Sequence, residues 1–253
     1  MADSIEQVAF VGSAGHRLSG ALHLPDRAPA GSLLMAHCFT CSKDIFTMTR
    51  LAHGLADAGF AVLRFDFTGL GESGGDFSRT TVSTNVGDLV RAATALIERG
   101  LGPCGLFGHS LGGAATLLAA HRVKTVRSVA VLGAPATPQH VRRLFRDVED
   151  RIRQQGQVVI DIAGRPFPIS SEFLDDLGRH DAEGRIADLG RPLLVCHALD
   201  DRVVDISEGE RIFERARQPK AFMPLLGADH LLTTRRSTEQ ALGVVVDWFV
   251  RTL

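Results

Sequence analysis

The chain has two successive patterns of apolar residues. Near the N-terminus, "VAFVGSAG" and "RLSGALHLP" are short β-like runs around a glycine-containing turn, which predicts a β-hairpin. From residue 32 onward, short and nearly continuous apolar runs alternate with helical patterns, two of which end in Gly59 and Gly100. Strands buried in this way are typical of a parallel sheet with helices on both faces. The expected strands are residues 32–37, 60–66, 104–110, 126–133, 191–198 and 220–227.

The alternation stops in the middle of the chain. Residues 134–190 contain a helical pattern from Pro138 to Gln155, two β-like runs around Ala163-Gly164, and the segment "SEFLDDLG". An insertion of this length is too long for an ordinary loop in a compact domain. We therefore predict an α/β core from residues 1–133 and 191–253, with residues 134–190 as a small cap over one end of the sheet. A separate mini-domain is the alternative.

One motif carries a specific chemistry. Residues 108–113 read GHSLGG, which contains G-x-S-x-G between an apolar strand and a helix of small residues. In this setting Ser110 is expected in an unfavourable backbone conformation that projects its hydroxyl above the sheet. Gly108 and Gly112 are expected to avoid collisions that a Cβ would make. Ser110 is therefore the candidate nucleophile.

A serine nucleophile needs a base, and the base needs an orienting carboxylate. Sites in such folds lie at the carboxyl ends of strands, which favours His230 after the run 220–227. His109 is expected to pack below Ser110, and His197 to be structural. The remaining weighed histidines fall in helical or hairpin patterns and are His16, His23, His121 and His140. The segment "LDDRVVD" offers three carboxylates, Asp200, Asp201 and Asp205.

Composition excludes several other functions. The formal net charge is −1 and the pI is near 6.8, so neither nucleic acid nor an anionic membrane is expected as a partner. No apolar run is long enough to span a membrane, and the first ten residues do not resemble a secretory signal. Four cysteines in 253 residues do not make a disulfide scaffold, which favours a reduced, cytoplasmic protein.

The chain resembles the α/β-hydrolase superfamily over nearly its whole length. Three features carry this resemblance. They are the strand-to-helix turn with G-x-S-x-G at Ser110, the chain order of serine, then aspartate, then histidine, and the segment "RFDFTGLGES" (residues 64–73). It implies an α/β-hydrolase fold. It also favours Asp201 over Asp200, because the segment looks like H-G-x-x-D-x-x-V with Val204 in register. The segments "AHCFTCSKD" and "AGRPFPI" more narrowly resemble the hydrolase half of bacterial fusions with an OsmC-type domain. The sequence ends at residue 253, just past the last expected helix, so we expect no second domain and no OsmC chemistry here.

The stretch His37–Lys43, "HCFTCSK", supports two interpretations. The resemblance places it where superfamily members supply one oxyanion-hole N–H, which implies the backbone N–H groups of Phe39 and Leu111 as donors. The C-x-x-C spacing of Cys38 and Cys41 is alternatively half a zinc site or a redox pair. A zinc site lacks a second ligand pair, since Cys104 and Cys196 are isolated in apolar strands. We also hypothesise that oxidation of the pair distorts the loop and lowers activity.

Together these features predict a serine hydrolase of a small acyl substrate, most simply a carboxylic ester, that needs no cofactor and no metal. A thioesterase, amidase or peptidase would use the same three residues. A protein of another class, a binding or redox-sensing module, would have no need for them. Apolar cap residues are candidates for an acyl pocket or, equally, for the cap's own core: Phe145, Phe167, Phe173 and Leu174.

Overall fold

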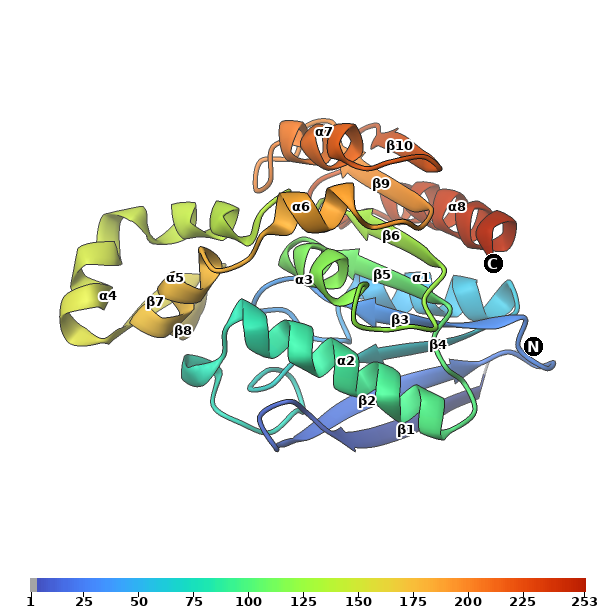
Figure 1. Ribbon diagram of the computed structural model, residues 1–253, viewed down its shortest axis with the longest axis horizontal. Helices are drawn as coiled ribbons and strands as arrows, with labels where there is room; N and C mark the ends of the chain where they lie inside the picture. Colours follow the sequence, from blue (N-terminus) through green and yellow to red (C-terminus); the bar gives the residue numbers. More distant parts are fainter. Residues whose placement is uncertain (1–3) are drawn as a thin grey trace.

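The computed structural model describes residues 4–253 and is built on one eight-stranded sheet (Figure 1). The strand order is β1-β2-β4-β3-β5-β6-β9-β10. The N-terminal hairpin pairs antiparallel with β4, and the other strands run parallel. The strands are β1 (Ser4–Val11), β2 (Arg17–Leu24), β3 (Gly31–Ala36), β4 (Phe60–Phe65), β5 (Gly105–His109), β6 (Ser128–Leu132), β9 (Leu193–Ala198) and β10 (Lys220–Leu225).

Helices cover both faces of this sheet, as the apolar strands require (Figure 1). One core layer joins the sheet to α1 and α8, and the other joins it to α2, α3 and α7. In α1 the buried residues Met48, Leu51 and Leu55 recur at spacings of three and four, so that they lie on one face of the helix. The helices of the core are α1 (Phe46–Asp57), α2 (Val82–Glu98), α3 (Leu111–Ala119), α7 (Ile206–Arg215) and α8 (Arg235–Thr252).

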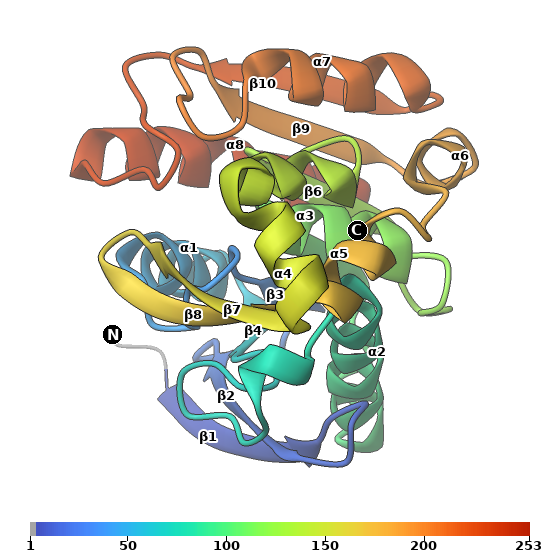
Figure 2. The same ribbon diagram turned by 90° about the vertical axis from the view of Figure 1, so that its left-hand side faces the viewer.

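The segment between β6 and β9 leaves the sheet and lies beyond one end of it, where β7, β8, α4 and α5 gather (Figures 1 and 2). β7 and β8 form a separate antiparallel hairpin. At the end of the segment, α6 contacts α3 and α7 of the core. The elements are the 3-10 helix η2 (Pro138–Val148), α4 (Glu149–Gln155), β7 (Gln157–Ile162), β8 (Arg165–Ser170), α5 (Ser171–Leu177) and α6 (Ala182–Ala187).

The predicted α/β-hydrolase fold is confirmed, including the N-terminal hairpin and the parallel sheet. The helix predicted from Pro138 to Gln155 is wrong in detail, since a 3-10 helix runs to Val148 and an α-helix follows. Val148 adopts φ −125° and ψ 1°, which is not α-helical, and this β-branched residue separates the two pieces. Among residues 4–253 no helix is both long and apolar enough to cross a bilayer.

Candidate active site

Ser110 occupies the turn between β5 and α3. Its backbone has φ 56° and ψ −127°, a conformation rarely adopted by residues other than glycine. A Cβ on Gly108 would lie 2.5 Å from Thr116 Oγ1, and one on Gly112 would lie 2.1 Å from the carbonyl oxygen of His37. The tight turn therefore depends on both glycines, as the sequence predicts, and it holds the Ser110 side chain at the start of α3.

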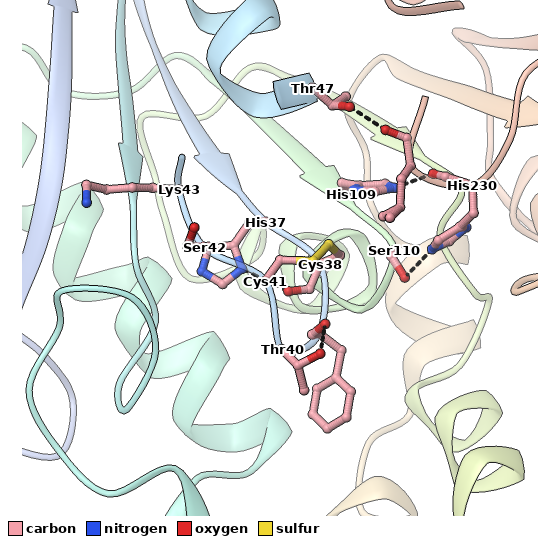
Figure 3. The surroundings of a disulfide bond; sticks show 12 residues. His37, Cys38, Thr40, Cys41, Ser42, Lys43, Thr47, His109, Ser110 and His230 are labelled. Atoms are coloured by element: carbon pink, nitrogen blue, oxygen red, sulfur yellow. Dashed lines mark hydrogen bonds between the residues drawn. A yellow bond between two sulfur atoms is a disulfide. The ribbon is translucent and has the colours of Figure 1, made fainter. Parts of the chain in front are cut away.

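Ser110, His230 and Asp201 meet at the carboxyl ends of three strands. His230 Nε2 lies 3.0 Å from Ser110 Oγ (Figure 3), and His230 Nδ1 lies 2.7 Å from Asp201 Oδ2. All three residues are buried, whereas the neighbouring Asp200 is exposed. Asp205 is instead the N-cap of α7, where its carboxylate accepts the N–H of Ser207. Of the three carboxylates in the segment, Asp201 is the one that reaches His230.

The Asp201 carboxylate is held ionised by its neighbours. Burial by itself would raise the pKa of Asp201, but the hydrogen bond with His230 and the N–H groups of Val203 and Val204 lower it below its ordinary value. Those two N–H groups donate to Oδ1 at 2.8 and 2.9 Å, which leaves Oδ2 for His230. Asp201 is thus fixed both in charge and in direction.

Two further buried histidines support this arrangement. His109 donates its Nε2–H to the backbone carbonyl of His230 at 2.8 Å (Figure 3). Burial lowers the pKa of His109 to about 3, and the nearby His230 adds to that effect, so His109 is neutral and can keep an unprotonated ring nitrogen. His197 Nε2 donates to the carbonyl of Val204 at 2.8 Å, and the same atom lies 3.7 Å from Asp201 Oδ2. His109 therefore supports the loop that carries His230, and His197 supports the one that carries Asp201.

The other weighed histidines lie elsewhere. His16 lies in the turn after β1 and His23 in β2. His121 bonds the carbonyl of Arg185, and His140 that of Val203. None of these four makes a hydrogen bond to Ser110 or Asp201 within the described part of the chain.

Phe39 and Leu111, the residues predicted to supply the oxyanion donors, both line one narrow cavity. Its lining includes Phe39, Leu111, Gly112 and Phe173, and its interior volume of about 10 Å³ corresponds to about one water molecule. Leu111 is the first residue of α3, so its N–H has no partner within the helix. The positive end of the α3 dipole also lies at this point. The Leu111 N–H, directly after Ser110, is therefore available to a small, negatively charged oxygen.

Cys38 and Cys41 form a disulfide within the loop that is predicted to supply an oxyanion donor (Figure 3). The expectation that the cysteines are reduced is therefore wrong for this pair. The redox-pair interpretation and the oxyanion-loop interpretation thus apply to the same residues, and neither sulfur is free to bind zinc while the disulfide is present. Cys104 and Cys196 are buried free thiols. Between the two linked residues, Thr40 adopts φ 61°, which costs a β-branched residue about 1 kcal/mol or more.

An ionic cluster around the buried Lys43 and Asp66 side chains anchors the far end of the same loop. The carboxylate of Asp66 accepts the backbone N–H of Lys43 at 2.6 Å and its ammonium group at 3.0 Å. Lys43 also donates to Glu72 at 2.6 Å and to Asp44 at 3.0 Å. Burial alone would lower the pKa of Lys43, but these three acceptors raise it well above the ordinary value. The ammonium group is therefore permanently charged.

The apolar cap residues predicted as a pocket gather around the Phe39 ring. Phe173 stacks on that ring with centroids 5.3 Å apart, and Phe145 meets it edge-on at 6.3 Å. Phe167 packs on Phe77, which in turn contacts Phe39. Leu174 is buried in the same apolar core. Of these four predicted residues, Phe173 lines the described cavity. A substrate-pocket role for all four stays a prediction.

Several supporting residues were not identified from the sequence. Lys43 and Asp66 received no role, although Asp66 lies in the quoted "RFDFTGLGES". Arg165 was also missed; its guanidinium donates to the carbonyl of Thr40 and lies over the Phe167 ring. The C-x-x-C spacing was the one sequence signal for the disulfide.

Comparisons with known proteins agree with the fold. The family model "Alpha/beta hydrolase family" matches residues 33–241. A crystal structure of the esterase domain of a Rhodothermus marinus protein is 38% identical, with a TM-score of 0.80 over 98% of both chains. Est1E from Butyrivibrio proteoclasticus, solved with ferulic acid, is 16% identical with a TM-score of 0.75 over 96% of this chain and 98% of that chain, and it shares the fold.

Curated relatives are more distant. The uncharacterised protein YfhR of Escherichia coli O157:H7 is 24% identical over 90% of this chain and 74% of its own. The lysophosphatidylserine lipase ABHD12 of Danio rerio is 27% identical over 66% of this chain, which spans 42% of that protein. The narrower likeness to OsmC fusions stays a prediction. The family match, the fold and the esterase-domain likeness together establish that the chain belongs to the alpha/beta hydrolase family, as an esterase-like enzyme.

Proposed function

We propose that the chain hydrolyses carboxylic esters through an acyl-enzyme on Ser110. The observation that carries the proposal is the pair of successive hydrogen bonds that join Ser110 Oγ to His230 and His230 to Asp201. A serine hydroxyl becomes a competent nucleophile when a positioned base takes its proton. The esterase-domain structure at 38% identity supports an ester as the substrate class.

In the first half of the reaction, Ser110 Oγ attacks the ester carbonyl carbon while His230 Nε2 takes the hydroxyl proton. The carbonyl oxygen becomes an oxyanion, which accepts the N–H groups of Phe39 and Leu111. Asp201 keeps the other imidazole proton on Nδ1 and stabilises the imidazolium that forms. The tetrahedral intermediate then collapses, and Nε2 gives its proton to the departing alkoxide.

In the second half, water attacks the acyl-Ser110 carbonyl and gives a proton to His230 Nε2. The second tetrahedral intermediate uses the same two oxyanion donors. Its collapse releases a carboxylic acid and returns the proton to Ser110 Oγ. No redox step and no metal-bound intermediate is required, so the chain's own residues suffice for the chemistry.

Packing beside the oxyanion loop predicts which esters react. The Phe39 and Phe173 rings stack with centroids 5.3 Å apart, and the cavity they line, about 10 Å³, has room for about one water molecule and for no acyl chain. We therefore expect short acyl groups, such as acetyl, to react with higher kcat/KM than octanoyl. A series of p-nitrophenyl esters, extended with a thioester and an anilide, measures this preference against the Ser110→Ala background. Phe173→Ala should shift the preference towards longer acyl groups.

The panel also decides between the candidate activities. Faster turnover of the thioester or the anilide than of any ester would assign the site to thioesterase or amidase chemistry instead. Turnover that is no greater than that of Ser110→Ala on every acyl substrate would reject the hydrolase proposal.

A further inference from the structure

The Cys38–Cys41 disulfide encloses the residue proposed as an oxyanion donor. Phe39 and Thr40 are the two residues between the linked cysteines. The backbone N–H of Cys41 also donates to the carbonyl of Cys38 at 3.2 Å, so the four residues form one closed turn. The covalent link therefore acts on the backbone segment whose direction sets where the Phe39 N–H points.

This turn contains a residue that favours another conformation. Thr40 is β-branched and adopts φ 61°, where L-residues other than glycine are uncommon. Its hydroxyl donates to the carbonyl of Phe39 at 2.6 Å, and its own carbonyl accepts from Arg165. A strained residue persists only where its surroundings fix it, and the disulfide is the one covalent restraint on the turn.

The flanks of the turn are already fixed by other contacts. On one side, buried His37 accepts the N–H of Phe67 at 3.3 Å and bonds the carbonyl of Cys38 at 2.8 Å. On the other side, Lys43 is tied to Asp66 through both its backbone and its side chain. The freedom left in the loop is therefore that of residues 38–42, and the disulfide removes most of it.

We propose that Cys38 and Cys41 are positioning residues for ester hydrolysis, and that their disulfide aims the Phe39 N–H at the oxyanion. The proposal rests on the serine-hydrolase function given above. It reverses the hypothesis that oxidation lowers activity. In the disulfide form, Ser110, His230 and Asp201 are hydrogen bonded in succession, and the cavity lined by Phe39 and Leu111 is present. The disulfide form is the more active form, and the dithiol form is slower.

Conversion between the two forms is an ordinary thiol–disulfide exchange. Cys41 is half-buried and Cys38 is buried, so an external thiolate reaches the disulfide from the Cys41 side. A dithiol reductant attacks Cys41 Sγ, forms a mixed disulfide and releases the Cys38 thiolate. The second thiol of the reductant then displaces the Cys41 thiolate, and the reductant leaves as a cyclic disulfide. Two electrons and two protons pass to the protein, which gains two thiols.

The test compares the two forms of one preparation. The oxidised protein is assayed with p-nitrophenyl acetate. It is then reduced with dithiothreitol, desalted without oxygen because thiols cleave this ester, and assayed again, with thiols counted by Ellman's reagent. We expect kcat to fall by about tenfold to a hundredfold, less than the 10²–10³-fold loss typical when a whole oxyanion donor is removed. KM should change by less than about twofold, and reoxidation should restore the rate.

A second readout separates positioning from a general loss of structure. A trifluoromethyl ketone adds to Ser110 as a tetrahedral hemiketal whose oxygen occupies the oxyanion hole. Its affinity should fall on reduction by the same factor as kcat. Near-ultraviolet circular dichroism of the reduced protein should remain that of the folded protein.

Two variants complete the design. Cys38→Ser/Cys41→Ser should have the rate of the reduced protein and no response to dithiothreitol. Cys104→Ser should keep the full response, since this free cysteine hydrogen bonds Ser32, a contact that serine can also make. Equal kcat in both forms, or a loss of kcat without a matching loss of inhibitor affinity, would overturn the inference and leave the esterase proposal standing. If the oxidised protein hydrolyses no acyl substrate, both proposals fail.

Discussion

Replacing Asp201 with asparagine is expected to lower kcat for ester hydrolysis by about 10⁴-fold. Asparagine has nearly the same shape, and its carbonyl oxygen can still accept the N–H groups of Val203 and Val204, which now donate to Oδ1. Its amide NH₂ then faces His230 Nδ1, where a carboxylate oxygen lies 2.7 Å away in the native protein. This geometry favours the imidazole tautomer with its proton on Nε2, which cannot accept the Ser110 proton.

The chain provides a matched control one residue away. Asp200→Asn removes the same charge from an exposed position that does not reach His230, so kcat should stay within about twofold of the native value. Steady-state kinetics with p-nitrophenyl acetate on both variants measure the difference. A large loss in Asp200→Asn together with a small one in Asp201→Asn would show that the carboxylate has been assigned to the wrong residue.

Replacing Lys43 with methionine is expected to lower the free energy of unfolding by about 3–5 kcal/mol. Methionine keeps much of the volume of the buried side chain but removes its charge. Asp66 would then remain fully buried, with Glu72 and Asp44 nearby and no ammonium group between them. An uncompensated buried carboxylate is costly, and Asp66 would still have to hold the end of the oxyanion loop. Urea denaturation at pH 7 measures the change.

A surface ion pair serves as the comparison for Lys43. Arg251 and Asp247 are paired at 2.8 Å on the exposed face of α8, and exposed pairs contribute little to stability. Arg251→Gln should therefore change the free energy of unfolding by less than about 1 kcal/mol. Similar small losses in Lys43→Met and Arg251→Gln would mean that the buried cluster does not stabilise the loop.

Local patterns are enough to predict the fold, because the apolar residues within each core strand or helix indicate which of its faces are buried. Five of the six residues of the strand "FAVLRF" are apolar, with apolar residues on both faces, and all six are buried in β4. The small residues after Ser110 predict a helix packed tightly on the sheet, and every residue of α3 is buried. The 3-10 helix η2 was not predictable in this way, since the spacing of four residues between buried Val141 and Phe145 is typical of an α-helix.

The residues of the candidate site likewise fall into two groups, those with a local sequence signal and those without one. Ser110 and His230 follow from a motif and from a position after a late strand, both of which are local signals. The Lys43–Asp66 pair joins residues 23 positions apart in sequence, and the Arg165–Thr40 contact joins residues 125 apart. Contacts of this kind arise from packing of the cap and the loops against one another, and a single sequence contains no local pattern that reports them.

The most direct test of the account is to find the acyl group on Ser110 during turnover. The protein is mixed with p-nitrophenyl acetate, quenched in acid within the first turnover, digested and analysed by mass spectrometry. We expect acetylation of the peptide that contains Ser110, with the acetyl group on Ser110 itself, and loss of this group at the rate of the deacylation step. Rapid ester hydrolysis with no acyl group on Ser110, and with the Ser110→Ala variant equally active, would contradict it.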